Sequence, residues 1–417
     1  MKSGLSFLVA ARQCEIEALQ QLGRSVELVG AVGSLVHALQ RERGLSNGWL
    51  GSAGQRFAQA LATQAGQADA LEAAARDAFA RLIDAPHGAP GARLCNRVAW
   101  ALTGLDALPA LRRDIRAQQL APARATGAYV KLIGALLAVV FEAADEASDP
   151  ALSRPLVALF NLMQGKELAG QERACGALAF ASGIGDAARQ QQWLHLIDAQ
   201  ERCFASFCEF ASPALQQAWQ QGLAGAPVAA LERLRRVACA APPGAALDTE
   251  HSTGWFDICS QRIDAMREVE VRLTDELMDL SQRQLAVALK ELQEQRALLD
   301  RLPDAPAHPV ADFFDRPALW PAAHADALPP RSMLDLVQEQ ARRLQAMSDE
   351  LQTVRASLNE RKLVERAKGL LMAHRRLSED DAHKMLRQTA MNQNRRLVDV
   401  AGSVLAMAEF LPLQAGS

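Results

Sequence analysis

Three arginines, each on a different predicted helix, lie on or beside helix faces that are otherwise apolar. At about 100° per residue, Arg43 falls within an apolar stripe, whereas Arg41 points to the opposite side. Arg173 lies at the edge of a second stripe and Arg262 in the middle of a third. A buried guanidinium must be paired or hydrogen-bonded, because an isolated buried charge is costly. Several such forked donors around one interior point would suit a small planar oxyanion.

The three stripes follow the 3.6-residue period of amphipathic helices. They comprise Val32, Leu35, Leu39, Ser46 and Leu50; Leu156, Leu159, Met163, Gly170, Ala174 and Ala177; and Trp255, Cys259, Met266, Val269, Leu273, Leu277 and Leu280. Residues 171–174 (QERA) also echo residues 41–44 (RERG), which suggests two bundles built on a common plan. For a single arginine on an apolar face, a structural Arg–Glu ion pair that holds helices in register is a better explanation than a ligand site. Glu167 could pair with one of the three arginines but not with all.

Composition limits the classes of protein to consider. The chain has 417 residues, of which 49% are hydrophobic and 22% charged, so it can bury a core, and its net charge of −3 argues against a wholly basic nucleic-acid coat. The seven cysteines form no Cys-x-x-Cys pair and are typical of free thiols in the cytoplasm. The best apolar run, Leu132 to Phe141, is about half of the ~20 residues that cross a bilayer, so we expect no membrane partner. We find no phosphate loop, nucleophile elbow or metal-ligand spacing, and so expect neither an enzyme nor a metal or cofactor.

The elements that position these side chains are predicted to be helices throughout. Ala, Leu, Gln, Arg and Glu dominate and no segment alternates like a strand, so the fold class is all-α. Pro and Gly cluster at 84–91, 222–227, 241–244 and 303–330, and the last cluster predicts a hinge after a large N-terminal domain. Beyond the hinge, alternating spacings of four and three predict a coiled-coil helix that forms a dimer; a single amphipathic helix lying on the large domain is the alternative. Its seam would be Met333, Val337, Gln340, Leu344, Met347, Leu351, Val354 and Leu358.

The motifs of the large domain resemble the NIT domain, the nitrate- and nitrite-sensing helical module of bacterial signalling proteins. The resemblance rests on Gln40–Gly44, Lys166–Arg173 and Trp255–Asp264. It implies a domain of two four-helix-type bundles in which core arginines bind nitrate or nitrite. By this resemblance the ligand-binding residues are Arg43, Arg173 and Arg262, and the third role stays open to Arg233, Arg235 or Arg236.

The C-terminal segment is predicted to be a small basic module of three helices. Residues 355–408 hold eleven Lys and Arg against six Asp and Glu, a net charge of +5 against −8 for the remainder. The first helix continues to Ala373, Ser378 caps the second, and Asn394 can cap the third. The inward faces would be Ala382, Met385, Leu386 and Thr389, then Leu397, Val400, Ala401, Val404 and Ala408. Such a basic patch is typical of polyanion binding, although a solvated helix face shows the same charges.

The residue order in AKGLLM (367–372), SEDDAHKMLRQTAM (378–391) and NRRLVDVAGSVL (394–405) resembles the ANTAR domain. The resemblance implies binding to paired stem-loops of leader RNA, which prevents a terminator from forming. No Phe, Trp or Tyr occurs in 355–408, so contacts to phosphate must dominate over base stacking. The RNA-binding residues it implies are Lys368, Arg387, Asn394, Arg395 and Arg396; the alternative for Lys368 is a role in close helix packing.

Together these features predict a cytoplasmic, homodimeric nitrate- or nitrite-responsive antitermination regulator that binds leader mRNA stem-loops. The predicted domains are the sensor at 30–282, a helical extension and Pro-rich linker at 283–330, the coiled-coil helix at 331–358, and the RNA-binding module at 350–411. The alternative is a signalling adaptor whose basic C-terminal helices dock on a protein partner.

Overall fold

The computed structural model describes residues 4–84, 90–145, 150–225, 227–242, 244–299, 379–393 and 395–408, together with 363–364, 367–368, 370–371 and 377. The predicted hinge at 303–330 and the coiled coil at 331–358 lie outside these residues. Within them the chain forms eleven helices and no strand, apart from one isolated bridge between Ile184 and Ala246. The all-α prediction is confirmed.

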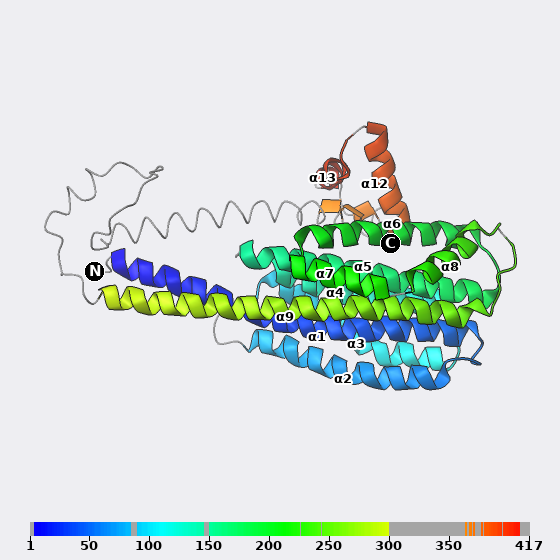
Figure 1. Ribbon diagram of the computed structural model, residues 1–417, viewed down its shortest axis with the longest axis horizontal. Helices are drawn as coiled ribbons and strands as arrows, with labels where there is room; N and C mark the ends of the chain where they lie inside the picture. The colour runs from blue at the N-terminus through cyan, green and yellow to red at the C-terminus, as the bar shows by residue number, and fades with distance from the viewer. Residues whose placement is uncertain are drawn as a thin grey trace, which may run out of the picture. The chain divides into compact units, whose positions relative to one another are not determined.

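The first four helices pack together as one bundle (Figure 1). They are α1 (Gly4–Gly51), α2 (Ala58–Ile83), α3 (Ala92–Arg116) and α4 (Pro122–Asp145). The second bundle consists of α5 (Pro150–Ser182), α6 (Ala187–Phe210) and α9 (His251–Leu299), with the short helices α7 (Pro213–Gly225) and α8 (Val228–Ala240) packed against α9. The Pro/Gly-rich clusters coincide with helix boundaries, as expected: 222–227 begins in the last turn of α7 and ends just before α8, and 241–244 lies between α8 and α9.

Local sequence explains several of these helix starts. Three helices, α4, α5 and α7, begin with proline, whose missing N–H costs nothing in the first turn. The side chain of Asp186 caps α6 by accepting a hydrogen bond of 3.0 Å from the backbone N–H of Ala188.

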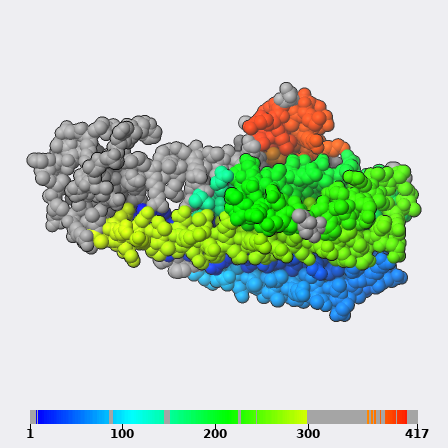
Figure 2. Space-filling model, viewed as in Figure 1, coloured from blue at the N-terminus to red at the C-terminus, as the bar shows by residue number. Residues whose placement is uncertain are grey.

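Helices α1, α5 and α9 contact one another where the two bundles meet. In Figure 2 the yellow surface of α9 lies between the blue surface of the first helices and the green surface of the later ones. Because α1 is covered on several sides, every residue from Glu42 to Gly48 is buried. The apolar stripe of α1 is therefore confirmed as inward, but it is only part of the buried surface.

Two helical stretches, Val9–Gly51 and Pro122–Ala144, are long and apolar enough to cross a bilayer by length and composition. In each, the most apolar window is 61% buried inside the protein. Residues 132–141, the apolar run noted in the sequence, belong to the second stretch. This burial is what the core helices of a bundle require.

The C-terminal unit has its own small core. Helices α12 (Glu379–Gln393) and α13 (Leu397–Ala408) pack with Ala367 and Leu371, burying the residues Ala382, Leu386, Ala390, Val400 and Ala401. The predicted inward positions Met385, Leu397 and Val404 are half-buried against this core, as is Thr389. Ala390 was missed. The two predicted caps, Ser378 and Asn394, lie outside the described residues, although α12 begins at Glu379, where a cap at 378 would place it.

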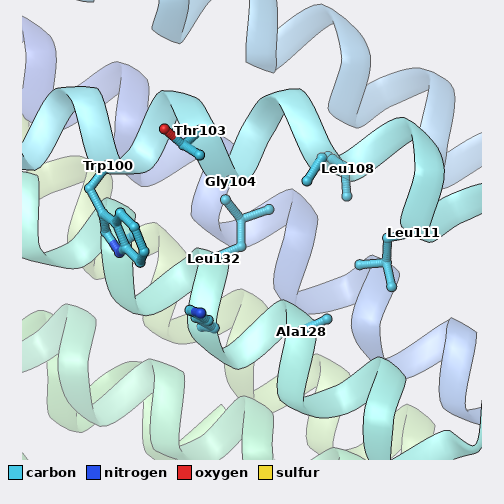
Figure 3. A pocket seen from close by; sticks show the side chains of 10 residues that line it. Trp100, Thr103, Gly104, Leu108, Leu111, Ala128 and Leu132 are labelled. Carbon is cyan, nitrogen blue, oxygen red and sulfur yellow. The ribbon is translucent and has the colours of Figure 1, made fainter. Parts of the chain in front are cut away.

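An apolar groove of about 280 Å³ lies between α3 and α4 (Figure 3). Trp100 stands at its rim with its ring 5.4 Å from the ammonium of Lys131. The remaining lining residues are uncharged, among them Gly104, Leu108 and Leu132. A groove of this chemistry is poorly suited to a small inorganic anion.

We predict that Gly176→Ala destabilises the second bundle. A Cβ at Gly176 would overlap the buried indole of Trp255 and lie 2.7 Å from that of Trp193, so both rings must shift. Overpacking of this kind costs about 1–3 kcal/mol. Urea unfolding followed by tryptophan fluorescence measures the change.

The matched control is Gly134→Ala on α4, where a Cβ meets nothing within 4 Å. There alanine should stabilise the helix by up to about 1 kcal/mol. Equal effects of the two substitutions would contradict the packing around Gly176.

Candidate anion-binding site

Two arginines cross where α1 passes α5. Arg43 of α1 lies over Gly170 of α5, where a Cβ would come within 2.6 Å of its Nη2 atom. Arg173 of α5 lies over Gly44 of α1, where a Cβ would come within 3.2 Å of its Nε atom. Each glycine makes room for the guanidinium of the opposite helix.

Arg43 is fully buried and paired. Its Nη1 and Nη2 atoms lie 2.5 and 3.2 Å from the carboxylate oxygens of Glu167, which is the pairing that the sequence had suggested for one arginine. Gln40 and Gln171 each donate a hydrogen bond of 2.9 Å to the same carboxylate. The Nε atom of Arg43 is buried without a hydrogen-bond partner among the described residues.

Arg173 is 1% exposed, and no carboxylate in the described part of the chain forms an ion pair with it. It donates hydrogen bonds to the hydroxyl of Ser260 at 2.9 Å and to the backbone carbonyl of Gln40 at 2.7 Å. Its guanidinium lies 5.0 Å from the ring centre of Phe256. Burial, together with the charge of Arg43, lowers the pKa of Arg173 to about 10. The predicted position at the edge of a stripe was wrong, because α9 covers this side of α5.

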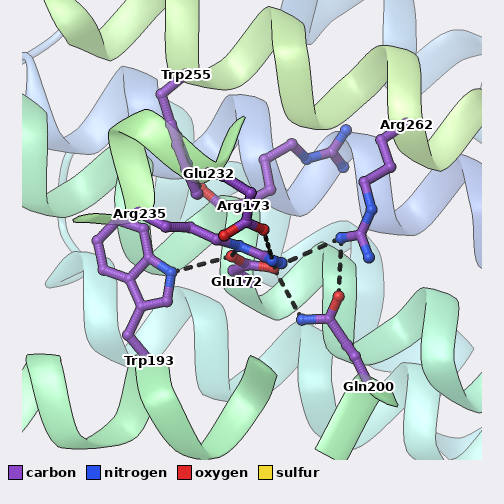
Figure 4. A network of polar contacts seen from close by, with 8 residues as sticks. All are labelled: Glu172, Arg173, Trp193, Gln200, Glu232, Arg235, Trp255 and Arg262. Atoms are coloured by element: carbon purple, nitrogen blue, oxygen red, sulfur yellow. Dashed lines mark hydrogen bonds and ion pairs between the residues drawn. The ribbon is translucent and has the colours of Figure 1, made fainter. Parts of the chain in front are cut away.

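A second cluster is centred on Glu172, which is next to Arg173 on α5 (Figure 4). Arg235 of α8 donates two hydrogen bonds, of 2.6 and 2.7 Å, to this carboxylate. Trp193 and Gln200 of α6 donate further bonds of 3.0 and 2.8 Å. Burial opposes ionisation of Glu172, but the hydrogen bond and charge of Arg235 outweigh it and hold the pKa below its usual range.

Arg262 belongs to this second cluster and not to the crossing of α1 and α5. It donates a hydrogen bond of 2.9 Å to Gln200, and its Nη1 atom lies 3.7 Å from Glu172. Its predicted place in the middle of an inward face was wrong, because Ile263 is the buried residue there and the Arg262 side chain is 14% exposed. Of the three alternatives, Arg235 is buried, whereas Arg233 and Arg236 are exposed. Their roles in ligand binding stay predictions.

A third cluster, which the sequence had not indicated, joins the same three central helices. The buried Lys166 of α5 and Arg267 of α9 both pair with the buried carboxylate of Glu270. Arg267 is largely buried, and its Nη2 atom donates a hydrogen bond of 2.7 Å to Ser34 of α1. Burial, helped by the charges of Lys166 and Arg267, lowers the pKa of His37 to about 2, so this imidazole is neutral.

The repeated motif has a structural counterpart on the two helices. Glu42, next to Arg43, accepts bonds of 2.6 and 2.8 Å from Arg112 of α3, as Glu172, next to Arg173, does from Arg235. In each motif the glutamate anchors a peripheral helix while the arginine faces the other central helix. Sequence periodicity missed Glu42, because consecutive charged residues point inward together only on a helix that is covered on several sides.

The charges of these clusters do not balance. Six buried or largely buried cations face three buried carboxylates in the clusters around Glu167, Glu172 and Glu270, with Arg173 included, among the described residues; the buried Glu42 of α1 is already paired with Arg112. The cations are Arg43, Lys166, Arg173, Arg235, Arg262 and Arg267, and the carboxylates are Glu167, Glu172 and Glu270. Asp264 and Glu232 lie half-exposed at the edge. A water-excluded core with surplus positive charge attracts anions.

In the C-terminal unit, the structure exposes Arg387, Arg395 and Arg396. Arg395 reaches the hydroxyl of Ser403 at 3.2 Å, along the first turns of α13. Lys368 is only 8% exposed, which fits the packing alternative better than a surface contact. Asn394 lies outside the described residues.

Fold and site thus define an all-helical ligand-responsive regulator that carries a cationic core and a small helical output module. Residues 34–278 match the NIT family, described as nitrate and nitrite sensing, and residues 352–405 match the ANTAR domain. The nitrate regulatory protein of Klebsiella oxytoca is 35% identical over 97% of this chain and 95% of its own length. A solved structure of the NasR transcription antiterminator is similar with a TM-score of 0.62 and 32% identity, over 96% of this chain and 98% of that one.

The chain therefore belongs to the family of nitrate-responsive antitermination regulators, in which an NIT domain precedes an ANTAR domain. The transcriptional regulatory protein PdtaR of Mycobacterium tuberculosis is also similar, with 33% identity over 27% of this chain and 49% of its own length. The expectation that the chain is not an enzyme is confirmed by this family. Membership of this family also supports nitrate as the ligand and RNA as the partner.

We predict that Arg235→Ala destabilises the second bundle by about 3 kcal/mol, because it leaves the buried Glu172 without its closest cation. The loss falls at the low end of the range for a broken buried pair, since Arg262 remains 3.7 Å away. Thermal unfolding of the full chain measures the effect. Arg236→Ala, a change at the exposed neighbour, should alter stability by less than about 0.5 kcal/mol; similar effects of the two variants would contradict the role of Arg235.

Proposed function

We propose that this chain is a cytoplasmic homodimer that binds nitrate or nitrite in the core of its NIT domain and then binds leader-RNA stem-loops to prevent termination. The observation that carries the anion site is Arg173, a buried guanidinium whose hydrogen bonds go to a hydroxyl and a backbone carbonyl and not to a carboxylate. A planar oxyanion would supply the missing negative charge. Such charge-assisted hydrogen bonds are stronger than bonds to neutral acceptors.

The proposed ligand residues are Arg43 and Arg173 at the crossing of α1 and α5. The third arginine, Arg262 or Arg235, would act through the Glu172 cluster, which is one residue away from Arg173 on α5. A ligand shifts an equilibrium only by its differential affinity for the two states, and a ten-fold preference corresponds to about 1.4 kcal/mol.

Helix α9 is the element best placed to carry the signal. It contributes Ser260 to Arg173, Arg262 to the Glu172 cluster and Glu270 to Lys166, and it continues unbroken to Leu299. A change in any of these contacts therefore acts on the helix that leads toward the RNA-binding part of the chain.

RNA contact is assigned to the exposed arginines of the C-terminal unit, Arg387, Arg395 and Arg396. Because residues 355–408 contain no aromatic side chain, affinity must come largely from phosphate contacts. Polar groups would then read the bases of the loops.

We predict that Arg43→Lys weakens nitrate binding at least ten-fold, because lysine keeps the charge but loses the forked donor geometry. Arg43→Ala should abolish nitrate-dependent antitermination while leaving nitrate-independent RNA binding measurable. Calorimetry with nitrate, nitrite, chloride and sulfate gives the affinities and the selectivity.

Arg41→Lys is the control, since Arg41 is the exposed neighbour on the same turn of α1. It should leave nitrate affinity unchanged. Unchanged nitrate affinity in Arg43→Lys would remove Arg43 from the site, and loss of both activities in Arg43→Ala would indicate a folding defect.

We predict that Arg396→Ala weakens binding to a two-hairpin leader RNA and lowers the salt dependence of that binding. Losing one phosphate contact should reduce the slope of log affinity against log salt by about 0.7–0.9. Gel shifts over a series of salt concentrations measure both quantities. Lys290→Ala on α9 is the control, because Lys290 is also an exposed cation but lies outside residues 352–405, which match the ANTAR domain. Absence of any shift with the unaltered protein at low salt would favour a protein partner.

A further inference from the structure

Glu167 occupies the donor edge of Arg43 that a planar anion would need. Its side chain is 4% exposed, and both of its oxygens accept hydrogen bonds from the two terminal nitrogens of the Arg43 guanidinium. Gln40 and Gln171 complete the shell with one bond each. A carboxylate is itself planar, with two oxygens that match a guanidinium fork. The Glu167 carboxylate thus lies where a planar anion would bind Arg43.

We propose that Glu167 is an internal competitor of the anion, and that nitrate or nitrite binds by displacing this carboxylate from Arg43. This inference rests on the proposed anion site and names the residue that sets its affinity. The Nη1 and Nη2 atoms of Arg43 both face Glu167, and Gly170 closes the opposite approach, because Arg43 Nη2 already lies against it. A bidentate contact of an oxyanion with this edge therefore requires the carboxylate to leave.

Local charge distinguishes Glu167 from the other buried carboxylates. Glu42 pairs with Arg112, which also reaches Asp69, so that cluster has no surplus cation. Glu172 lies between Arg235 and Arg262, and its movement would leave Arg262 without its carboxylate and would also break the hydrogen bonds from Trp193 and Gln200. Glu167 faces Arg43 with the unpaired Arg173 across the same helix crossing. An anion that replaced Glu167 there would bind the fork of Arg43, whose charge also acts on the neighbouring Arg173.

The displaced carboxylate has a route to solvent. Gln171, one turn along α5, already donates to Glu167 and is half-buried at the margin of the core. A rotation of Glu167 toward Gln171 would bring its charge to that margin. The exchange also breaks the direct ion pair between α1 and α5, so anion binding would loosen one contact between the central helices as it forms another.

Competition of this kind raises the apparent dissociation constant of the anion, because only molecules with the carboxylate displaced are competent to bind. Neutralising residue 167 should remove that competition. In Glu167→Gln, calorimetry on the full chain should show nitrate binding at least ten-fold more tightly than in the unaltered protein. Thermal unfolding should show a larger rise of the melting temperature with nitrate, since stabilisation follows ligand concentration relative to the dissociation constant.

Glu42→Gln is the matched control. Glu42 is equally buried, forms an equally forked pair with an arginine, and lies next to Arg43 in the sequence, but it faces α3. Its loss should lower stability without tightening nitrate binding. Glu167→Asp keeps the charge on a shorter side chain and should tighten binding by less than Glu167→Gln, which provides a second test if the glutamine variant folds poorly without nitrate.

Unchanged or weaker nitrate affinity in Glu167→Gln and Glu167→Asp, with the unaltered protein binding nitrate, would overturn the competitor role and make Glu167 a structural partner of Arg43. Equal tightening in Glu42→Gln would also overturn it, because the effect would then reflect general loosening of the fold. If neither the unaltered protein nor Glu167→Gln binds nitrate, the anion site itself is refuted along with the competitor.

Discussion

The central constraint on this protein is the guanidinium of Arg173, which is buried in a helical core and forms no ion pair with a carboxylate among the residues that the structure describes. The core compensates its charge with a hydroxyl, a backbone carbonyl and the face of Phe256, all of which are dipoles or quadrupoles and not full charges. A full negative charge at the same place would interact more strongly in this low-dielectric setting. The difference between the two kinds of compensation is the free energy that an anion can use to favour one arrangement of the helices.

The repeated Glu-Arg pair explains how such a core remains folded. Glu42 and Glu172 each bind one arginine from a peripheral helix, and these closed pairs fasten α3 and α8 to the central helices. Breaking either pair would strand a buried charge, so both act as fixed anchors. The neighbouring arginines, Arg43 and Arg173, are held by the same two helices but face each other across Gly44 and Gly170. The two closed Glu–Arg pairs thus fix the backbone positions from which Arg43 and Arg173 extend.

Much of the fold, and part of the site, could be predicted from the sequence. The 3.6-residue period gave the inward position of Arg43 and the core of the C-terminal unit, such as Ala382 and Leu386, because each of those faces is a single apolar stripe. The same method missed Glu42 and Lys166, since it allows one inward face for a helix that is in fact covered on several sides. It misplaced Arg262, because a neighbouring apolar residue on α9 fills the core position. The pairing of charges depends on which helices meet, and periodicity within one helix does not contain that information.

Helix α9 is long enough to contact several of the buried clusters in turn. Over 49 residues it packs successively against the Glu172 cluster, the Lys166–Glu270 pair and the N-terminal part of α1, where Arg12 pairs with Glu291. Helix α9 is continuous from His251 to Leu299, so Ser260, Arg262 and Glu270 lie on one unbroken element. Because Lys166 and Glu167 are adjacent on α5, a change at Arg43 acts directly beside the pair that attaches α5 to α9. The proposed anion site and the attachment of α9 thus share two consecutive residues of α5.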